Sequence, residues 1–179
     1  MEFIETGIAG LILIKPKVFN DHRGFFLESY SEEAFRKAGI TCCFVQDNHS
    51  RSAQKGVVRG LHFQRQPFAQ SKLVRVTRGS VYDVVVDLRQ GSSTFGQWRG
   101  FELSERNFNM LFVPQGFAHG FCTLEENSEM QYKVDNPYSP THDAGILWND
   151  PSFGIDWPVQ NPILSEKDGK LPLFKDLRL

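Results

Sequence analysis

The sequence predicts an all-β fold, an antiparallel jelly-roll barrel with a few short peripheral helices. Much of the chain alternates apolar and polar residues over short spans, which is the period of half-buried strands. Glycine, proline, asparagine and aspartate stand between these spans and can supply the turns. Many short strands with a single clear helix favour a jelly roll, whose interior can hold a ligand.

The composition favours one domain over residues 1–179 and a small-molecule partner. With 179 residues, of which 40% are hydrophobic and 13% aromatic, the chain can bury one substantial core. Its formal net charge is −1, and its basic and acidic residues are interspersed. This charge pattern argues against nucleic acid and against a membrane surface as partners.

We expect the protein to be cytoplasmic. The early apolar run at residues 8–14 is short, is interrupted by Gly10 and follows acidic residues, so it fits neither a signal peptide nor a membrane-spanning helix. Cys42, Cys43 and Cys122 have no metal-binding or redox spacing, and their odd number argues against a closed disulfide framework.

Two segments show the expected elements most clearly. In residues 72–88, KLVRVTRGSVYDVVVDL, the alternation on both sides of TRGS predicts a central hairpin whose second strand is covered on both faces. Residues 31–39 predict a peripheral helix, because Ser31 can cap its first turn and Gly39 can end it.

The composition changes after about residue 135 and becomes rich in proline, aspartate and asparagine. Trp148, Phe153 and Trp157 would not be left in solvent. We therefore expect an ordered tail that wraps over the sheets.

Residues 114–119, PQGFAH, match the Pro-x-Gly-x-x-His pattern of the second cupin motif. The first cupin motif would supply a His-x-His pair and a glutamate, but GLHFQ offers only His62, followed by Phe63. None of the five histidines forms a metal-binding pair in sequence. The chain thus resembles a cupin barrel without its metal, and we expect neither a metal nor another cofactor.

Without a metal, protein acids and bases must carry the chemistry, and histidine titrates closest to neutral pH. His62 would need a carboxylate partner, for which Asp83, Asp143 and Asp168 are candidates. The alternative is that His62 is a structural histidine packed within its strand.

Arg59, Lys72, His119 and Tyr132 also lie on predicted strands. If these strands converge in one barrel, their side chains form a cavity with cations, a base and a phenol. Taken singly, Lys72 can be a solvated lysine at a strand end and Tyr132 a core aromatic. Asp168 can instead end a capping box begun by Ser165.

Several motifs occur together and in order over residues 7–168, and with them the sequence resembles the dTDP-4-dehydrorhamnose 3,5-epimerase family. They are DHRGFFLESY, QDNHS, VVRGLHFQ, PFAQSKLVRVTRGSVYDVVVDLR, STFGQW, VPQGFAHGF, GILWNDPSFGIDWP and LSEKD. The resemblance implies a cofactor-free, homodimeric enzyme that converts dTDP-4-dehydro-6-deoxy-D-glucose into dTDP-4-dehydro-L-rhamnose. Carbons 3 and 5 are inverted, and both lie next to the ketone, so their hydrogens can leave as protons.

The resemblance also implies roles for individual residues. The proton acceptor falls on His62, its carboxylate partner on Asp168, the proton donor on Tyr132 and the lysine near the ketone on Lys72. The residues expected to bind the diphosphate, sugar or nucleotide are Arg23, Glu28, Gln46, Asp47, Asn48, Arg59, His119 and Lys167.

One segment departs from the family pattern. In THDAGI, Asp143 stands where the family commonly has glutamate, and Ala144 stands where arginine is frequent. We still expect Asp143 to bind substrate, and its shorter side chain keeps the charge but has less reach toward the substrate or the tail. Tyr138 is expected either to stack on the base or to form the wall of the site.

Three other functions remain open on sequence alone. A related enzyme could epimerise only carbon 3 or only carbon 5 of a specialised deoxysugar. A metal cupin could use His119 with other ligands. A non-catalytic sugar-nucleotide binding module could keep Arg59 and Lys72 for affinity and need no base.

Overall fold

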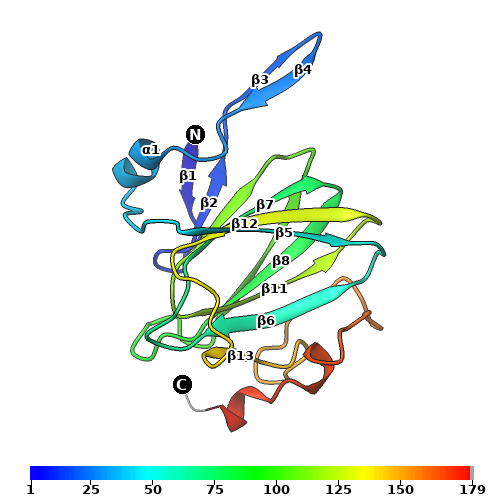
Figure 1. Ribbon diagram of the computed structural model, residues 1–179. Coiled ribbons are helices and arrows are strands. Elements are labelled where there is room, and N and C mark those ends of the chain that lie inside the picture. Colours follow the sequence, from blue (N-terminus) through cyan, green and yellow to red (C-terminus); the bar gives the residue numbers. More distant parts are fainter. Residues whose placement is uncertain (178–179) are drawn as a thin grey trace.

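Two antiparallel sheets face each other and form the body of the protein (Figure 1). The structure is a computed structural model, and it describes residues 1–177. One sheet has the order β1-β2-β10-β7-β12-β5, the other the order β13-β6-β11-β8-β9, and β3 and β4 form a separate hairpin. The predicted antiparallel jelly roll is therefore confirmed.

The strands of the six-stranded sheet are β1 Glu2–Glu5, β2 Ile12–Lys15, β5 Gln46–Ser52, β7 Lys72–Arg78, β10 Met110–Val113 and β12 Ser128–Val134. Those of the five-stranded sheet are β6 Val58–Gln64, β8 Ser80–Asp87, β9 Trp98–Ser104, β11 Phe117–Thr123 and β13 Asp143–Gly145. The hairpin consists of β3 Val18–Asp21 and β4 Gly24–Leu27. The helical elements are α1 Glu32–Lys37 and the 3-10 turns η1 Asp168–Lys170 and η2 Phe174–Asp176.

The predicted helix is present as α1. The Ser31 hydroxyl accepts a hydrogen bond from the Ala34 backbone N–H at 3.4 Å, so it caps the first turn as expected. Phe35 is buried and packs the helix against the outside of the six-stranded sheet, next to Ile14 and Met110.

The predicted hairpin at residues 72–88 is wrong. Its two strands exist, but β7 pairs with β10 and β12, whereas β8 pairs with β9 and β11. Gly79 alone joins them and carries the chain from one sheet to the other with φ +69°. Val74 and Val76 of β7 face Val81 and Val85 of β8 within the core, so the alternation reflects packing between sheets.

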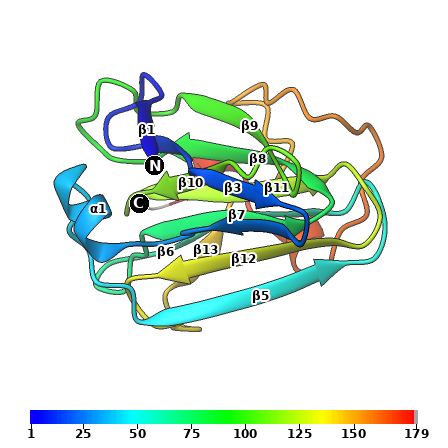
Figure 2. The ribbon, with the colours of Figure 1, turned by 90° about the horizontal axis from the view of Figure 1, so that it is seen from above.

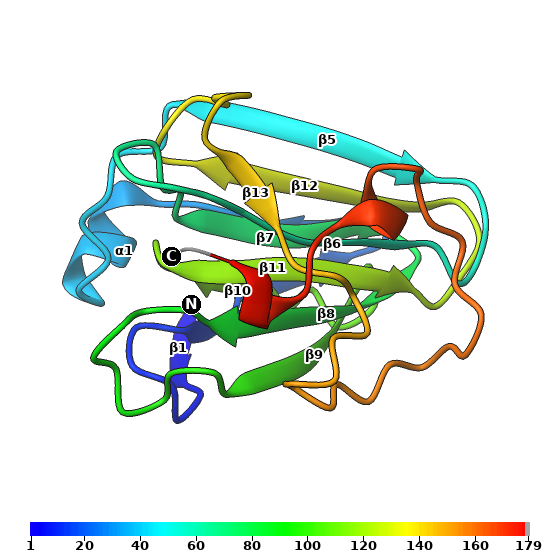
Figure 3. The same cartoon turned by 90° about the horizontal axis from the view of Figure 1, so that it is seen from below.

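The tail after β13 crosses the outer face of the five-stranded sheet, as expected (Figure 3). Trp148, Phe153 and Trp157 pack against this face, and the Trp157 indole N–H donates to the Trp148 carbonyl at 2.8 Å. The path of the tail brings η1 back beside β6. No helix within residues 1–177 is long and apolar enough to cross a membrane.

The β3–β4 hairpin extends away from the two sheets in Figure 1, and Figure 2 looks down on it from above. Phe19, Phe25 and Phe26 on it are half or more exposed, at 50%, 60% and 66%. An apolar surface of this kind is typical of a contact with another molecule.

Candidate active site

A cavity of about 440 Å³ opens between the two sheets at the end where the tail returns. Charged and hydrogen-bonding side chains from β6, β7, β11, β12 and the tail line it together with apolar ones. The ionisable residues among them are Arg59, His62, Lys72, His119, Tyr132, Lys167 and Asp168. The expected convergence of these side chains is thus observed.

A second lobe of about 380 Å³ shares four of these residues, which are His62, Lys72, Tyr132 and Lys167. It adds Gln46 and Asn48 from β5, Tyr138 from the segment before β13 and Asp143 from the start of β13. The two lobes therefore form one cleft around the same lysine, histidine and tyrosine.

A bulge in β6 lets Arg59 and His62 face the same cavity. Residues three apart in a regular strand point to opposite faces. Here His62 pairs with His119 and Arg59 with Phe121, so three steps on β6 oppose two steps on β11. The extra residue restores the common direction of the two side chains.

Glycine makes this bulge possible. Gly60 has φ +121°, and a Cβ there would lie 2.6 Å from the Gly120 Cα and 2.8 Å from the His119 carbonyl oxygen. No other residue allows this close approach between β6 and β11.

His62 and Asp168 form a hydrogen-bonded pair. The distance from His62 Nε2 to Asp168 Oδ1 is 2.5 Å, although the residues are 106 positions apart in the sequence. Burial alone would raise the pKa of Asp168, but His62, Ser165 and Lys167 together lower it below its ordinary value. The carboxylate therefore stays ionised and directs the other ring nitrogen of His62 to the cavity.

Asp168 has both of the roles that its sequence context allowed. Its backbone N–H donates to the Ser165 hydroxyl at 3.0 Å, as in a cap, while its side chain contacts His62. The cap holds η1 in place, so the turn that carries the carboxylate is itself fixed.

Lys72 lies in the cavity, and no residue among 1–177 forms a hydrogen bond with its ammonium group. Its side chain is nearly buried, and burial lowers its pKa to about 8, against the opposing effect of the Asp83 and Asp143 charges. A buried cation without a fixed partner is suited to an oxyanion of the ligand.

Tyr132 stands on the opposite wall from His62, because β12 belongs to the six-stranded sheet and β6 to the other. Burial raises the pKa of its phenol, with Arg59 acting in the opposite direction. The phenol therefore keeps its proton near neutral pH and can donate it.

The three candidate carboxylates for His62 have separate partners. Asp83 contacts His119, with its two oxygens 2.9 and 3.0 Å from Nε2. Asp143 accepts a hydrogen bond from the Tyr138 hydroxyl at 3.1 Å and forms an ion pair with Lys167. The shorter aspartate at position 143 thus still reaches the tail.

Arg59 is held at the mouth of the cavity. Its Nε donates to the Ser52 hydroxyl and its Nη2 to the Arg51 carbonyl, both at 3.1 Å. The sequence interpretation missed Ser52, although its place in the alternation of β5 puts it on the same face as Gln46 and Asn48.

Three expected binding residues lie outside this cleft. Arg23 sits at the turn of the β3–β4 hairpin, where it is exposed and paired with Asp21 at 2.6 Å. Glu28 follows β4 and is exposed. Asp47 points to the other face of β5 and pairs with Lys133 at 2.9 Å.

The ionisable groups of residues 1–177 include no cluster of three or more His, Cys, Asp or Glu that could hold a metal ion. The cavity contains three groups that can take part in proton transfer: the His62 imidazole, which can act as a base, the Tyr132 phenol on the facing wall, which can act as an acid, and the Lys72 ammonium group. Such a set can move a proton next to a carbonyl group and stabilise the resulting enolate.

Comparisons with known proteins agree on one family. A family model described as dTDP-4-dehydrorhamnose 3,5-epimerase matches residues 5–176. The chain is 53% identical over 169 residues to the dTDP-4-dehydrorhamnose 3,5-epimerase of Shigella flexneri. The match covers 94% of this chain and 93% of that protein.

Two solved structures are also similar. The dTDP-4-dehydrorhamnose 3,5-epimerase of Bacillus anthracis str. Ames, with TDP and PPi bound, is 54% identical, with a TM-score of 0.95 and coverage of 96% of this chain and 98% of that one. The dTDP-6-deoxy-D-glucose-3,5-epimerase of Legionella pneumophila, in complex with dTDP-4-keto-L-rhamnose, is 46% identical, with a TM-score of 0.95 and coverage of 99% and 94%. The chain belongs to the dTDP-4-dehydrorhamnose 3,5-epimerase family.

Proposed function

We propose that the cleft binds dTDP-4-dehydro-6-deoxy-D-glucose and inverts its carbons 3 and 5 to give dTDP-4-dehydro-L-rhamnose. The observation that carries this proposal is the placement of the His62–Asp168 pair and Tyr132 on opposite walls, with the unpaired Lys72 in the same cavity. Inversion requires a base on one face of the sugar and an acid on the other.

Each inversion can be written with protein groups alone. His62 removes the proton from the carbon next to the ketone, and the electron pair of the broken C–H bond forms the enolate, whose charge lies on the carbonyl oxygen. Lys72 stabilises that oxygen, and the Tyr132 hydroxyl protonates the carbon from the other side. Exchange with solvent then returns His62 and Tyr132 to their starting states, so the reaction needs no cofactor.

The nucleotide and diphosphate are proposed to occupy the open side of the cleft. Arg59 is charged and exposed there, and its fork of donors suits a phosphate group. Gln46 and Asn48 line the second lobe and offer amide groups to a base, with Tyr138 beside them. Lys167, His119 and Asp143 are proposed to bind the sugar and diphosphate between these groups.

We also propose a homodimer in the cytoplasm. The projecting β3–β4 hairpin has exposed phenylalanines that a second copy would bury, and it carries Arg23 away from the cavity of its own chain. In such a dimer Arg23 and Glu28 would complete the cavity of the partner subunit. Free thiols at Cys42, Cys43 and Cys122 suit a reducing compartment.

The proposed reaction can be tested by turnover in heavy water. We expect deuterium from solvent at both carbon 3 and carbon 5 of the product. Label at one carbon only would indicate a single-carbon epimerase, and label at neither would contradict the proposal. Stoichiometric metal in purified protein, with loss of turnover on chelation, would instead favour a metal cupin.

Two variants identify the base and the acid. His62→Ala should abolish exchange at both carbons while dTDP binding is retained, with kcat lower by about 100-fold or more. Tyr132→Phe should still allow exchange but should lose inversion, because His62 can return a proton only to the face from which it was taken. A binding module without catalysis would show no turnover in the unmodified protein.

A further inference from the structure

Asp83 is the most deeply buried carboxylate near the active site, and the reaction described above assigns it no role. It lies in β8 between Val81 and Val85, whose side chains belong to the core between the sheets, and it is fully buried. An ionised carboxylate in such a place is costly unless a partner compensates it.

Its partner is His119. In the β8–β11 ladder His119 pairs with Val85, so Asp83 is the diagonal neighbour on the same inward face. Both carboxylate oxygens contact Nε2, at 2.9 and 3.0 Å. The pair resembles His62–Asp168, but its carboxylate comes from a core strand and not from the tail.

This contact determines which nitrogen of His119 meets the ligand. Within residues 1–177 no side-chain nitrogen or oxygen is both buried and without a hydrogen-bond partner, and Nδ1 of His119 takes part in no protein hydrogen bond. Since His119 lines the cavity, Nδ1 must be accessible from it. The hydrogen bond at Nε2 thus leaves Nδ1 for the substrate.

Asp83 also acts on Lys72 through its charge. Burial lowers the pKa of Lys72 to about 8, and Asp83 is the larger of two charges, the other being Asp143, that oppose this decrease. Without Asp83 the pKa of Lys72 would fall further, and a larger fraction of Lys72 would be neutral near pH 7. A neutral amine cannot stabilise an enolate oxygen as an ammonium group does.

We propose that Asp83 is a positioning residue for the epimerisation, which orients His119 toward the substrate. This inference rests on the proposed function. The other ionisable side chains that line the cleft around Lys72 come from β6, β11, β12, β13 with its preceding segment, and the tail. They are Arg59, His62, His119, Tyr132, Tyr138, Asp143, Lys167 and Asp168, whereas β10 contributes only apolar residues.

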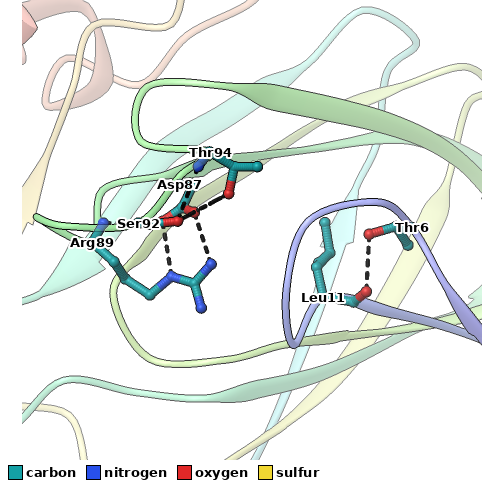
Figure 4. Close-up of polar contacts among 6 residues, drawn as sticks. All are labelled: Thr6, Leu11, Asp87, Arg89, Ser92 and Thr94. Carbon is teal, nitrogen blue, oxygen red and sulfur yellow. Dashed lines mark hydrogen bonds and ion pairs between the residues drawn. The ribbon is translucent and has the colours of Figure 1, made fainter.

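The test compares Asp83→Asn with a matched control, Asp87→Asn. Asp87 is on the same strand and is equally buried, but it lies away from the cavity, where Arg89, Ser92 and Thr94 donate hydrogen bonds to it (Figure 4). The pH profile of kcat and the NMR titration of the Lys72 side chain are measured for both variants and for the unmodified protein.

For Asp83→Asn we expect kcat at pH 7 to fall by about 10- to 100-fold, which is the range for carboxylates that orient a metal-bound histidine. The basic limb of the kcat profile and the Lys72 titration should both move to lower pH by roughly one unit. Asp87→Asn should lower the melting temperature and leave the Lys72 titration unchanged. A folded Asp83→Asn protein whose kcat at pH 7 equals that of the unmodified protein would overturn the proposal.

Two further measurements keep the outcome clear. If Asp83→Asn does not fold, Asp83→Ser removes the same charge with a smaller side chain. In the unmodified protein, ¹⁵N NMR should show the proton of His119 on Nε2 and should show Nδ1 responding to dTDP-sugar; a proton on Nδ1 in the neutral ring would contradict the inference. These NMR results need no turnover, so they stand apart from the deuterium experiment that tests the function.

Discussion

Lys72 is a charged side chain placed where a charge is costly. It is nearly buried at the edge of the core, and no described residue offers it a hydrogen bond. The lack of a protein partner destabilises the folded state. For the same reason Lys72 interacts strongly with a negative charge that forms on the substrate. The proposed reaction therefore depends on a residue that destabilises the folded state.

Replacing this lysine should separate stability from activity. The pKa of Lys72 is about 8 in the folded state, below its ordinary value of 10.5, so the folded state disfavours the ammonium form. Below pH 8 the cost is present in full, and it disappears as pH rises from 8 to 10.5. Lys72→Met should raise the free energy of unfolding at pH 7 by up to about 3 kcal/mol, since each pKa unit corresponds to about 1.4 kcal/mol.

Urea unfolding at pH 7 and pH 10.5 measures this effect, and turnover should be lost in the same variant. Lys133→Met is the control, because Lys133 is on the outer face of β12 and pairs with the exposed Asp47. It should change stability by less than about 1 kcal/mol. A destabilised Lys72→Met protein at pH 7 would contradict the account of Lys72.

At the scale of the elements, the alternation of apolar and polar residues correctly predicted which face of a strand each side chain lies on. It did not predict which strands pair with each other. Val74, Val76 and Lys72 of β7 face the interior of the protein, as the pattern predicts. The same pattern cannot distinguish a hairpin from two strands that pack face to face, and so the pairing of β7 with β8 was wrong. Successive residues of a strand point to opposite faces, so the sequence alone could have placed Asp47 on the face of β5 opposite to Gln46 and Asn48.

The β6 bulge is the element on which the site depends most. Arg59 and His62 share a face only because the ladder with β11 shifts between them, and a spacing of three residues in the sequence gives no sign of that shift. Gly60→Ala would place a Cβ 2.6 Å from the Gly120 backbone at φ +121°. We expect a loss of about 2–4 kcal/mol in stability and a large decrease in kcat/KM.

Gly96→Ala is a suitable control for the backbone conformation. Gly96 also has positive φ, at +75°, but a Cβ there meets nothing within 4 Å. This variant should cost only about 1–2 kcal/mol and should keep its activity. Thermal unfolding and steady-state kinetics of the two variants compare a steric clash with strain alone; equal losses in both would argue against a special role for the bulge.

At the scale of the whole molecule, the fold brings together groups that are distant in sequence. His62 and Asp168 meet because the tail crosses the outside of one sheet, and Tyr132 faces them from the other sheet. The family motifs allowed these three residues to be predicted from the sequence as site residues. Their distances, the pairing of Asp83 with His119 and the position of Arg23 required the structure, because they depend on tertiary packing.

The position of Arg23 leads to a test of the proposed dimer by subunit complementation. If Arg23 serves the cavity of the partner subunit, Arg23→Ala and His62→Ala homodimers should each be nearly inactive. A heterodimer of the two would have one intact cavity, formed by His62 of one subunit and Arg23 of the other. Random assortment of equal amounts should then restore about a quarter of the unmodified activity.

Mixing His62→Ala with Lys72→Met is the matched control, because both residues line the same cavity of one chain. No heterodimer of these two variants has an intact site, so activity should not return. Mass measurement in solution confirms whether dimers form, and refolding from a denatured mixture exchanges the subunits. If Arg23→Ala and His62→Ala fail to complement although heterodimers are present, Arg23 acts within its own chain or not at all, and the hairpin then serves only to join the subunits.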